Sequence, residues 1–225
     1  MSEEIVRSTL TLIDIEKVGD DYFIFNFEMP KGITFKEGQY GAFKHVDKDI
    51  EGRIVRAFSY ASGTKENIFK IGTKIIDKPS DFKAKMRELK KGDTMTVDGP
   101  LGDFTLEQDY NSVFLAAGIG ITPIRSMLKQ IEDIDYTKEA TLVYAEHRKF
   151  YCFTEDFSKM TNINVKYEET GENMKSTAAI MSSRYKNDTF YYVSGPPGYV
   201  TSVTTILENE GVDPKQIKFD KFMGY

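Results

Sequence analysis

The feature of this 225-residue sequence that most constrains its fold is a change of rhythm near residue 111. Before that point, short strand-like runs are separated by turn-rich pieces such as "KEG" and "KKGD". After it, apolar strand-like runs alternate with helix-like segments. Serial short strands are typical of an antiparallel barrel or sandwich, whereas strand–helix alternation is typical of a parallel sheet covered by helices. The sequence therefore predicts two domains, residues 1–108 and 109–225, each of a size that suits a compact unit.

The first half contains six strand-like runs, at residues 5–18, 22–29, 38–43, 54–62, 67–76 and 93–100. Their spacing predicts an antiparallel barrel or sandwich. One helix is expected over Ser80–Leu89, because Ser80 can cap its start and Phe82, Met86 and Leu89 share one face.

The second half predicts a doubly wound sheet of five parallel strands with helices on both faces. The strand-like runs are residues 112–118, 141–146, 163–167, 190–195 and 216–222. The helix-like segments between them are Ile124–Ile131, Thr154–Met160, Lys175–Met181 and Tyr199–Asn209.

Composition narrows the class of protein. The formal net charge of −5 does not suggest a nucleic-acid-binding surface. No apolar run approaches the roughly 18 residues of a membrane span, and the N-terminus lacks the features of a signal peptide, so a cytoplasmic protein is expected. The single cysteine, Cys152, excludes an internal disulfide and a four-cysteine zinc or iron–sulfur site. Because only His45 and His147 could add imidazole ligands, no structural metal is predicted.

The stretch "AAGIGITPIRSML" follows an apolar strand and opens a helix. Gly118 and Gly120 let the backbone approach a ligand closely, while Thr122 can cap the helix and Pro123 suits its first turn. A helix N-terminus beside such a turn favours phosphate, although a tight strand-to-helix turn without a ligand has the same residues. In "VSGPPGY", Gly195, Pro196 and Pro197 form a rigid turn expected at the same edge of the sheet.

The stretch "RAFSYAS" places a cation, Arg56, in an apolar strand-like segment. A buried guanidinium without an anion is costly, so this residue either grips an anionic ligand or pairs with an acidic neighbour on the surface. At the C-terminus, "KFDKFMGY" ends on an aromatic residue, Tyr225, whereas chain ends are usually polar and frayed.

Taken in order, "RAFSYAS", "GPLGDF", "AAGIGITPIRSML", "VSGPPGY" and the terminal aromatic residue resemble the ferredoxin–NADP reductase family of flavoprotein reductases. The similarity extends over nearly the whole chain. It implies a six-stranded antiparallel Greek-key β-barrel with a capping helix that binds FAD. It also implies a second domain that binds a nicotinamide dinucleotide.

The resemblance assigns roles in FAD binding to the first half. Arg56 would bind the FAD pyrophosphate, and Phe58, where the family usually has tyrosine, would stack on the isoalloxazine. Ser59 would lie near flavin N5. The remaining implied FAD residues are Ile71, Gly72 and Thr73 beside the flavin, and Ser80, Phe82 and Lys83 at the helix start.

In the second half, the resemblance implies that Gly118, Gly120, Thr122 and Pro123 receive the coenzyme pyrophosphate. Gly195, Pro196 and Pro197 match the family's turn beside the nicotinamide, and Ser194 stands where the family usually has cysteine. Tyr225 would cover the flavin and move aside for the nicotinamide. Ser59, Ser194 and Tyr225 are therefore the implied catalytic residues.

The implied activity is hydride transfer from NAD(P)H to bound FAD, followed by electron transfer to ferredoxin, flavodoxin or another acceptor. Because the one cysteine excludes a built-in cluster, an iron–sulfur partner would be a separate chain. The alternatives are a reductase of free flavins and a non-catalytic electron-transfer subunit that keeps the fold. The coenzyme also stays open, since Glu146 favours NADH whereas His147, Arg148 and Lys149 favour NADPH.

Overall fold

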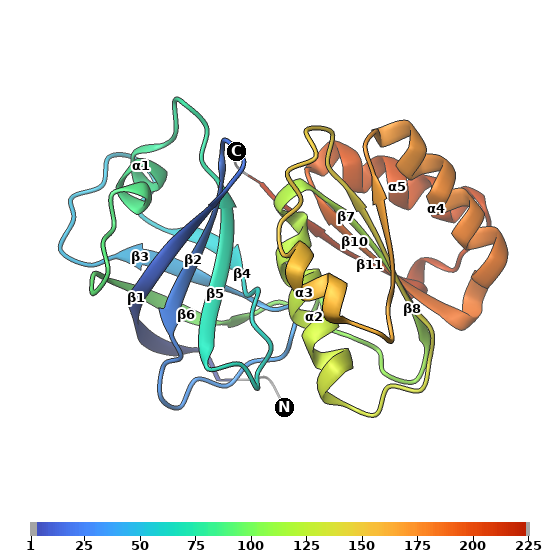
Figure 1. Cartoon of the computed structure of the whole chain (residues 1–225), viewed down its shortest axis with the longest axis horizontal. Coiled ribbons are helices and arrows are strands. Elements are labelled where there is room, and N and C mark those ends of the chain that lie inside the picture. The colour runs from blue at the N-terminus through green and yellow to red at the C-terminus, as the bar shows by residue number, and fades with distance from the viewer. Residues whose placement is uncertain (1–3, 224–225) are drawn as a thin grey trace.

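The structure, a computed structural model, describes residues 4–223. Two domains lie side by side, with a barrel formed by the first part of the chain and a parallel sheet with helices formed by the second (Figure 1). The two sheets separate between Leu101 and Asn111. The precise boundary at residues 108 and 109 stays a prediction.

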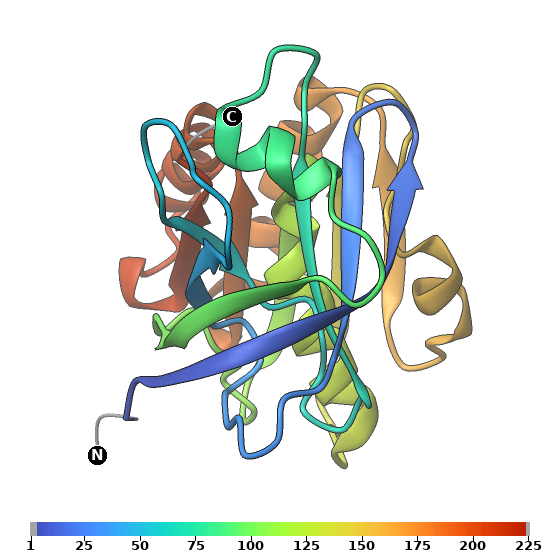
Figure 2. The same ribbon diagram turned by 90° about the vertical axis from the view of Figure 1, so that its left-hand side faces the viewer.

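The first domain is a six-stranded antiparallel sheet curled into a near-barrel. Its strands are β1 (Val6–Val18), β2 (Tyr22–Glu28), β3 (Tyr40–His45), β4 (Arg56–Ser59), β5 (Ile68–Lys74) and β6 (Thr94–Leu101), in the order β4-β3-β6-β1-β2-β5. An isolated bridge between Tyr60 and Ile71 brings the two edges of the sheet together. The helix α1 (Asp81–Arg87) covers one end of the near-barrel (Figure 2).

Aromatic side chains fill the barrel. Phe25, Phe27, Phe43, Tyr60 and Phe69 are all inaccessible to solvent, and the rings of Tyr60 and Phe69 pack edge-on with centroids 4.9 Å apart. Burial of such rings is the main stabilising contribution in a domain of this size. The core therefore fixes which faces of β3 and β4 point outward.

The second domain is a five-stranded parallel sheet in the order β11-β10-β7-β8-β9. Its strands are β7 (Asn111–Ala117), β8 (Ala140–Ala145), β9 (Asn164–Glu168), β10 (Thr189–Gly195) and β11 (Ile217–Lys221). Its α-helices are α2 (Ile121–Asp133), α3 (Thr154–Lys159), α4 (Gly171–Tyr185) and α5 (Pro197–Asn209), with the 3-10 turns η1 (Gly118–Gly120), η2 (Lys186–Asp188) and η3 (Pro214–Gln216). The helices α2 and α3 cover the face toward the barrel, and α4 and α5 cover the other face (Figure 1).

The strand and helix predictions are confirmed in kind and order, but α2, α4 and α5 begin earlier than expected. The helix α2 begins at Ile121 with Gly120 as its N-cap, so the predicted capping role of Thr122 is wrong. The Thr122 hydroxyl instead donates a hydrogen bond to the Ile119 carbonyl, 3.0 Å away. Ser80 is the N-cap of α1, as predicted, but within the described chain its side chain makes no capping hydrogen bond.

The domains share a core. Tyr22 and Ile24 of the barrel and Phe104 and Leu106 of the connecting segment are buried in the same cluster as α2 residues such as Ile124. No helix within residues 4–223 is long and apolar enough to cross a membrane. No group of three or more possible metal ligands of the His, Cys, Asp or Glu type occurs in that part of the chain either.

Candidate functional site

A cleft of about 320 Å³ opens between the outer face of the barrel and the end of β11. Its walls come from β3, β4 and the loop before it, β5, α1, the η1 turn, and β11 with the residues that follow it. The lining residues are Tyr40, Arg53, Arg56, Ala57, Phe58, Ser59, Gly72, Thr73, Lys83, Ile119, Asp220, Lys221, Phe222 and Met223. Its size and its mixed apolar and charged lining suit part of a large planar ligand.

Cations crowd one wall of the cleft. The Nε atom of Arg56 is buried and has no hydrogen-bond partner among residues 4–223. Burial, with Arg53 nearby, lowers the pKa of Arg56. Burial, together with the charges of Arg56 and Lys74, lowers the pKa of Lys83 to about 8. A cluster of desolvated cations is stabilised by a bound anion, and a pyrophosphate has the required charge.

The other wall joins the two domains. The Ser59 hydroxyl donates a hydrogen bond to Oδ2 of Asp220, 3.0 Å away on β11. Burial raises the pKa of Asp220 to about 6. A carboxyl group that titrates near neutral pH beside a hydroxyl is able to hold or pass on a proton at this wall.

Phe58 borders the cleft, but its ring packs mainly into the barrel core. It lies edge-on against Phe43, with ring centroids 5.4 Å apart, and tilted against Phe82 at 6.2 Å. Only 7% of the residue is exposed. The predicted stacking of Phe58 on a flavin ring stays a prediction.

A second cavity, of about 440 Å³, lies at the carboxyl ends of the parallel strands. It is lined by the turn after β7, the loops after β8, β9 and β10, and two barrel residues: Tyr22, Lys74, Ala117, Gly118, Ala145, Glu146, His147, Glu169, Thr170, Pro196 and Tyr199. Parallel α/β sheets bind their ligands at this edge.

Two glycines of the turn after β7 have different structural roles. Gly118 has φ +54°, a left-handed conformation that favours glycine, and it borders the cavity. Gly120 is buried, and a Cβ there would lie 2.4 Å from the Ser194 carbonyl oxygen and 2.6 Å from the Gly195 Cα. Gly120 therefore allows the turns after β7 and β10 to pack closely, and it does not border the cavity.

A network around Glu146 closes the barrel side of this cavity. The Tyr22 hydroxyl donates to Glu146 Oε2, and the Arg148 amide donates to Glu146 Oε1 at 3.0 Å. The Arg148 guanidinium lies 5.3 Å from the centre of the Tyr22 ring and donates to Asp21 Oδ1 at 2.7 Å. Residues of the barrel thus take part in organising the second cavity.

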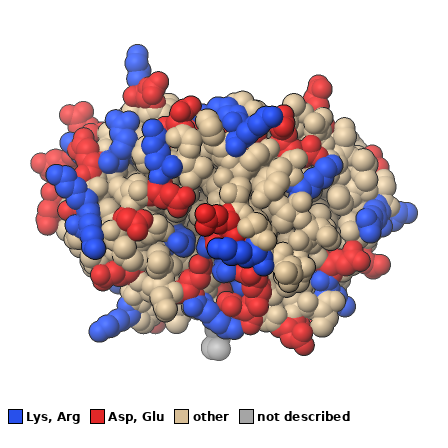
Figure 3. All heavy atoms as spheres, viewed as in Figure 1, with Lys and Arg blue, Asp and Glu red and all other residues tan. Residues whose placement is uncertain are grey.

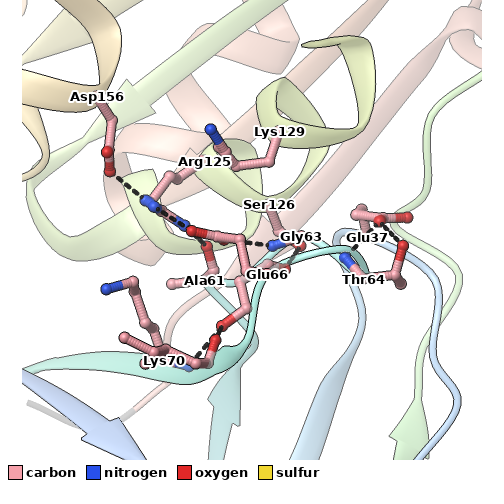
Figure 4. Close-up of polar contacts among 12 residues, drawn as sticks. Glu37, Ala61, Gly63, Thr64, Glu66, Lys70, Arg125, Ser126, Lys129 and Asp156 are labelled. Carbon is pink, nitrogen blue, oxygen red and sulfur yellow. Dashed lines mark hydrogen bonds and ion pairs between the residues drawn. The ribbon is translucent and has the colours of Figure 1, made fainter. Parts of the chain in front are cut away.

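A buried arginine of α2, Arg125, connects the second domain to the barrel through hydrogen bonds and ion pairs (Figure 4). The Nη1 and Nη2 atoms of Arg125 donate to the two carboxylate oxygens of Glu66, at 2.8 and 2.9 Å, and its Nε donates to Asp156 at 2.7 Å. Nη1 also donates to the Ala61 carbonyl at 2.6 Å. Because Arg125 is only 1% exposed, this clamp holds the loop after β4 against the second domain.

The structure sorts the predicted residues into groups. Arg56, Phe58, Ser59, Gly72, Thr73 and Lys83 meet at the first cleft, and Gly118 and Pro196 meet at the second cavity. Ile71 and Phe82 are core residues of the barrel, and Thr122 and Pro123 are buried in α2, so none of these side chains borders either space. Ser80 caps α1, Gly195 and Pro197 flank Pro196, and Tyr225 lies outside the described residues.

Ser194 remains a candidate because of its orphaned hydroxyl. It is fully buried at the end of β10, and its Oγ has no hydrogen-bond partner within residues 4–223.

Sequence reasoning missed Asp220, Tyr40 and Tyr22. The alternation in "IKFDK" places Asp220 on the strand face opposite Ile217, but no local signal shows that it meets Ser59, and the contacts of Tyr40 and Tyr22 likewise depend on the fold.

Comparison with known proteins adds to this geometry. A family model described as the oxidoreductase FAD-binding domain matches residues 9–106. The F subunit of the Na⁺-translocating NADH-quinone reductase of Pasteurella multocida is 27% identical over 229 residues, covering 88% of this chain and 56% of that protein. Its counterpart in Haemophilus ducreyi is 26% identical over 231 residues. The chain therefore spans about half the length of the curated relatives it matches.

Solved structures match over both domains. A ferredoxin NADP⁺ reductase from Neisseria gonorrhoeae, determined with bound FAD and NADP, has a TM-score of 0.79 at 18% identity, covering 96% of this chain and 98% of that one. The ferredoxin reductase in carbazole 1,9a-dioxygenase has a TM-score of 0.80 at 16% identity, covering 99% and 71%.

These findings define the class: the chain has the two-domain fold of the FAD-containing, NAD(P)H-dependent ferredoxin reductases. Residues 9–106 match the model of the oxidoreductase FAD-binding domain, and this match supports FAD as the cofactor of the first domain. The cleft fits that cofactor, because the buried Nε of Arg56 has no partner among residues 4–223 and Lys83 adds a second cation to the same wall.

Proposed function

We propose that this chain takes hydride from a nicotinamide coenzyme onto its bound FAD and passes the electrons to a separate acceptor, either a redox protein or a small molecule. The observation that carries the proposal is the cationic cleft at Arg56, which faces the end of β11 across the domain boundary. The second cavity, at the carboxyl ends of the strands, supports a dinucleotide site in the other domain.

When bound, FAD supplies the redox chemistry, accepting a hydride and releasing electrons one or two at a time. The chain's own residues supply placement. Arg56 and Lys83 bind and orient the diphosphate, and Thr73 and Ile119 also line the cleft. Ser59 and Asp220 hold a proton at the domain boundary, where Asp220 Oδ2 accepts from the Ser59 hydroxyl.

Ser194 and the turn Gly195–Pro197 position the nicotinamide end of the coenzyme in this proposal. The buried, unpartnered Oγ of Ser194, at least among residues 4–223, is a donor available to a polar ligand group. Tyr225 keeps the covering role that the sequence predicts for it. The two hydrogen bonds from Arg125 to Glu66 maintain the relative orientation of the domains. The approach of the nicotinamide ring to the flavin ring depends on that orientation.

The nature of the electron acceptor is inferred from the cysteine content of the sequence and from the relatives. These 225 residues contain one cysteine, which is too few to ligate an iron–sulfur cluster, so such an acceptor would be held by residues outside them. The curated relatives are named as subunits of an NADH-quinone reductase, which is consistent with an electron-entry role. Figure 3 shows basic and acidic side chains intermixed over the displayed face. The charge of that face therefore does not indicate whether a protein acceptor would be acidic or basic.

The test is an anaerobic titration of the FAD-loaded protein with each nicotinamide coenzyme, followed by the flavin absorbance. Bleaching of the oxidised flavin band by about one equivalent of NADH or NADPH is expected, with recovery on addition of an acceptor such as ferricyanide. Retention of the yellow colour through extensive dialysis distinguishes this reductase from a reductase of free flavins. Absence of bleaching with both coenzymes would contradict the proposal and favour a non-catalytic subunit that keeps the fold.

A further inference from the structure

The loop after β8 and the β1–β2 hairpin meet at the rim of the second cavity. Glu146, the first residue after β8, is 3% exposed and borders the cavity. Phe150, four residues further on, packs against Gly19 of the hairpin, where an added Cβ would lie 2.3 Å from its ring. A segment of the FAD-binding domain therefore reaches the place where the coenzyme domain offers its ribose-end residues.

The acidic side chains at this rim point to one kind of coenzyme. Glu146 follows β8 and Glu169 follows β9, and both border the cavity. A carboxylate after the second strand of such a sheet suits the 2′-hydroxyl of an NADH ribose and repels the 2′-phosphate of NADPH. That phosphate carries close to two negative charges at neutral pH, so the repulsion acts at short range in a partly desolvated site.

Of the residues that follow Glu146, Arg148 and Lys149 form ion pairs with carboxylates. Arg148 donates to Asp21 of the hairpin at 2.7 Å, and its guanidinium is also covered by the rings of Tyr22 and Phe150. Lys149 pairs with Glu169 at 2.8 Å. His147 Nδ1 lies 3.4 Å from Glu146 Oε1.

We propose that the β1–β2 hairpin of the FAD-binding domain sets the coenzyme preference toward NADH from across the domain boundary. Tyr22 holds the carboxylate of Glu146 at the cavity rim. Asp21 binds the guanidinium of Arg148 and the Nζ of Lys74, at 2.7 and 3.4 Å, and so offsets the charges that a 2′-phosphate would use. The inference rests on the proposed function only in taking the second cavity as the coenzyme site.

The decisive variant is Asp21→Asn, which leaves every residue of the coenzyme domain unchanged. It removes the charge that balances Arg148 and Lys74, the latter of which borders the cavity. The matched control is Asp20→Asn, at the exposed neighbouring position of the same turn. Both variants change the net charge of the protein equally. A difference between them in coenzyme preference therefore arises from the contacts of Asp21 with Arg148 and Lys74.

The measurement is kcat/KM for NADH and for NADPH with the FAD-loaded full chain. The wild-type protein should prefer NADH by about tenfold or more, and D21N should raise kcat/KM for NADPH by roughly three- to tenfold. D20N should keep the wild-type ratio. A preference of the wild-type protein for NADPH, or equal ratios in D21N and D20N, would overturn the inference.

Two further variants sharpen the test. In D21N/R148Q most of the gain with NADPH should be lost, and retention of the whole gain would overturn the role of Arg148. If D21N folds poorly, Tyr22→Phe keeps the ring beneath Arg148 but lacks the hydroxyl that binds Glu146. Y22F should narrow the preference for NADH, and an unchanged ratio would overturn the role of Tyr22.

A binding experiment separates this inference from the proposed function. Calorimetric titration with ADP-ribose and with its 2′-phosphorylated form requires neither flavin reduction nor an acceptor. Tighter binding of ADP-ribose, with the difference narrowed in D21N, supports the inference even if neither coenzyme bleaches the flavin. Tighter binding of the phosphorylated ligand by the wild-type protein overturns it even if the reductase activity is confirmed.

Discussion

Ser59 on β4 of the barrel donates a hydrogen bond to Asp220 on β11 of the second domain, with 3.0 Å between Oγ and Oδ2. The two residues are 161 positions apart in the chain, so the contact exists only when the domains are correctly docked. It places an acid whose pKa burial raises to about 6 at the wall of the proposed FAD cleft.

This acid makes stability depend on pH in a defined direction. An unfolded aspartate has a pKa near 3.8, so between about pH 4 and 6 the folded protein binds more protons and loses stability as the pH rises. Asp220→Asn should therefore be more stable than the wild-type protein at pH 8, by about 3 kcal/mol, because it removes a desolvated charge. The advantage should shrink as the pH falls through 6 and be gone near pH 4, as measured by urea denaturation. An advantage of equal size at pH 8 and pH 4 would contradict this origin, and the exposed Asp20→Asn serves as the control.

Arg56 should matter for FAD binding more than for folding. Its buried Nε has no partner among residues 4–223, so Arg56→Gln removes an unbalanced cation and should leave the unfolding free energy unchanged or slightly higher. The affinity for FAD should fall by about 10- to 100-fold, because charge-assisted hydrogen bonds contribute about 1.5–3 kcal/mol. Quenching of flavin fluorescence on titration into the apoprotein measures the affinity. Arg7→Gln, at the exposed pair with Asp98, is the control, and equal affinities in the two variants would argue against the role of Arg56.

The Arg125 clamp predicts a large loss of stability. Arg125→Met leaves the Glu66 carboxylate and the Ala61 carbonyl without their buried donor, so we expect a loss of about 3–5 kcal/mol. Lys85→Met removes one side of the exposed pair between Lys85 of α1 and its C-cap residue Glu88, 3.9 Å apart, and should change stability by less than about 1 kcal/mol. Urea denaturation of both variants gives the comparison. Similar midpoints would show that the clamp contributes little.

Local patterns were sufficient for the architecture. The alternation of the barrel strands and the strand–helix rhythm after residue 111 follow from side-chain periodicity, which is a local property. Sequence patterns place the start of α2 too late, because Thr122 is a good capping residue by type. In the structure Gly120 is the N-cap of α2, and the Thr122 hydroxyl donates to the Ile119 carbonyl. A propensity cannot show that the η1 turn continues directly into the helix.

The site was predictable only where one segment carries it. The segment "RAFS" marks Arg56 as a candidate through its charge, and the family resemblance adds Ser59; the cleft contains both. Asp220 and Tyr22 could not be found in this way, because each acts through a residue more than 100 positions away on the other domain. The sequence records which side chains a strand presents, but the partner across a domain boundary is set by how the two cores dock.

The packing of Gly120 gives the last prediction. Its φ of −60° suits any residue, but a Cβ would meet backbone atoms of Ser194 and Gly195 at 2.4–2.6 Å, which cannot move away as a flexible side chain could. Gly120→Ala should therefore cost on the order of 2–3 kcal/mol and weaken binding of ADP-ribose, because it separates the two turns at the coenzyme edge. Gly198→Ala is the matched control: it lies in the first turn of α5, no described atom is within 4 Å of its added Cβ, and alanine should be neutral or stabilise by about 0.5–1 kcal/mol. Thermal unfolding and calorimetry decide the matter, and a G120A protein as stable and as competent in binding as G198A would show that the two turns are not held together by this contact.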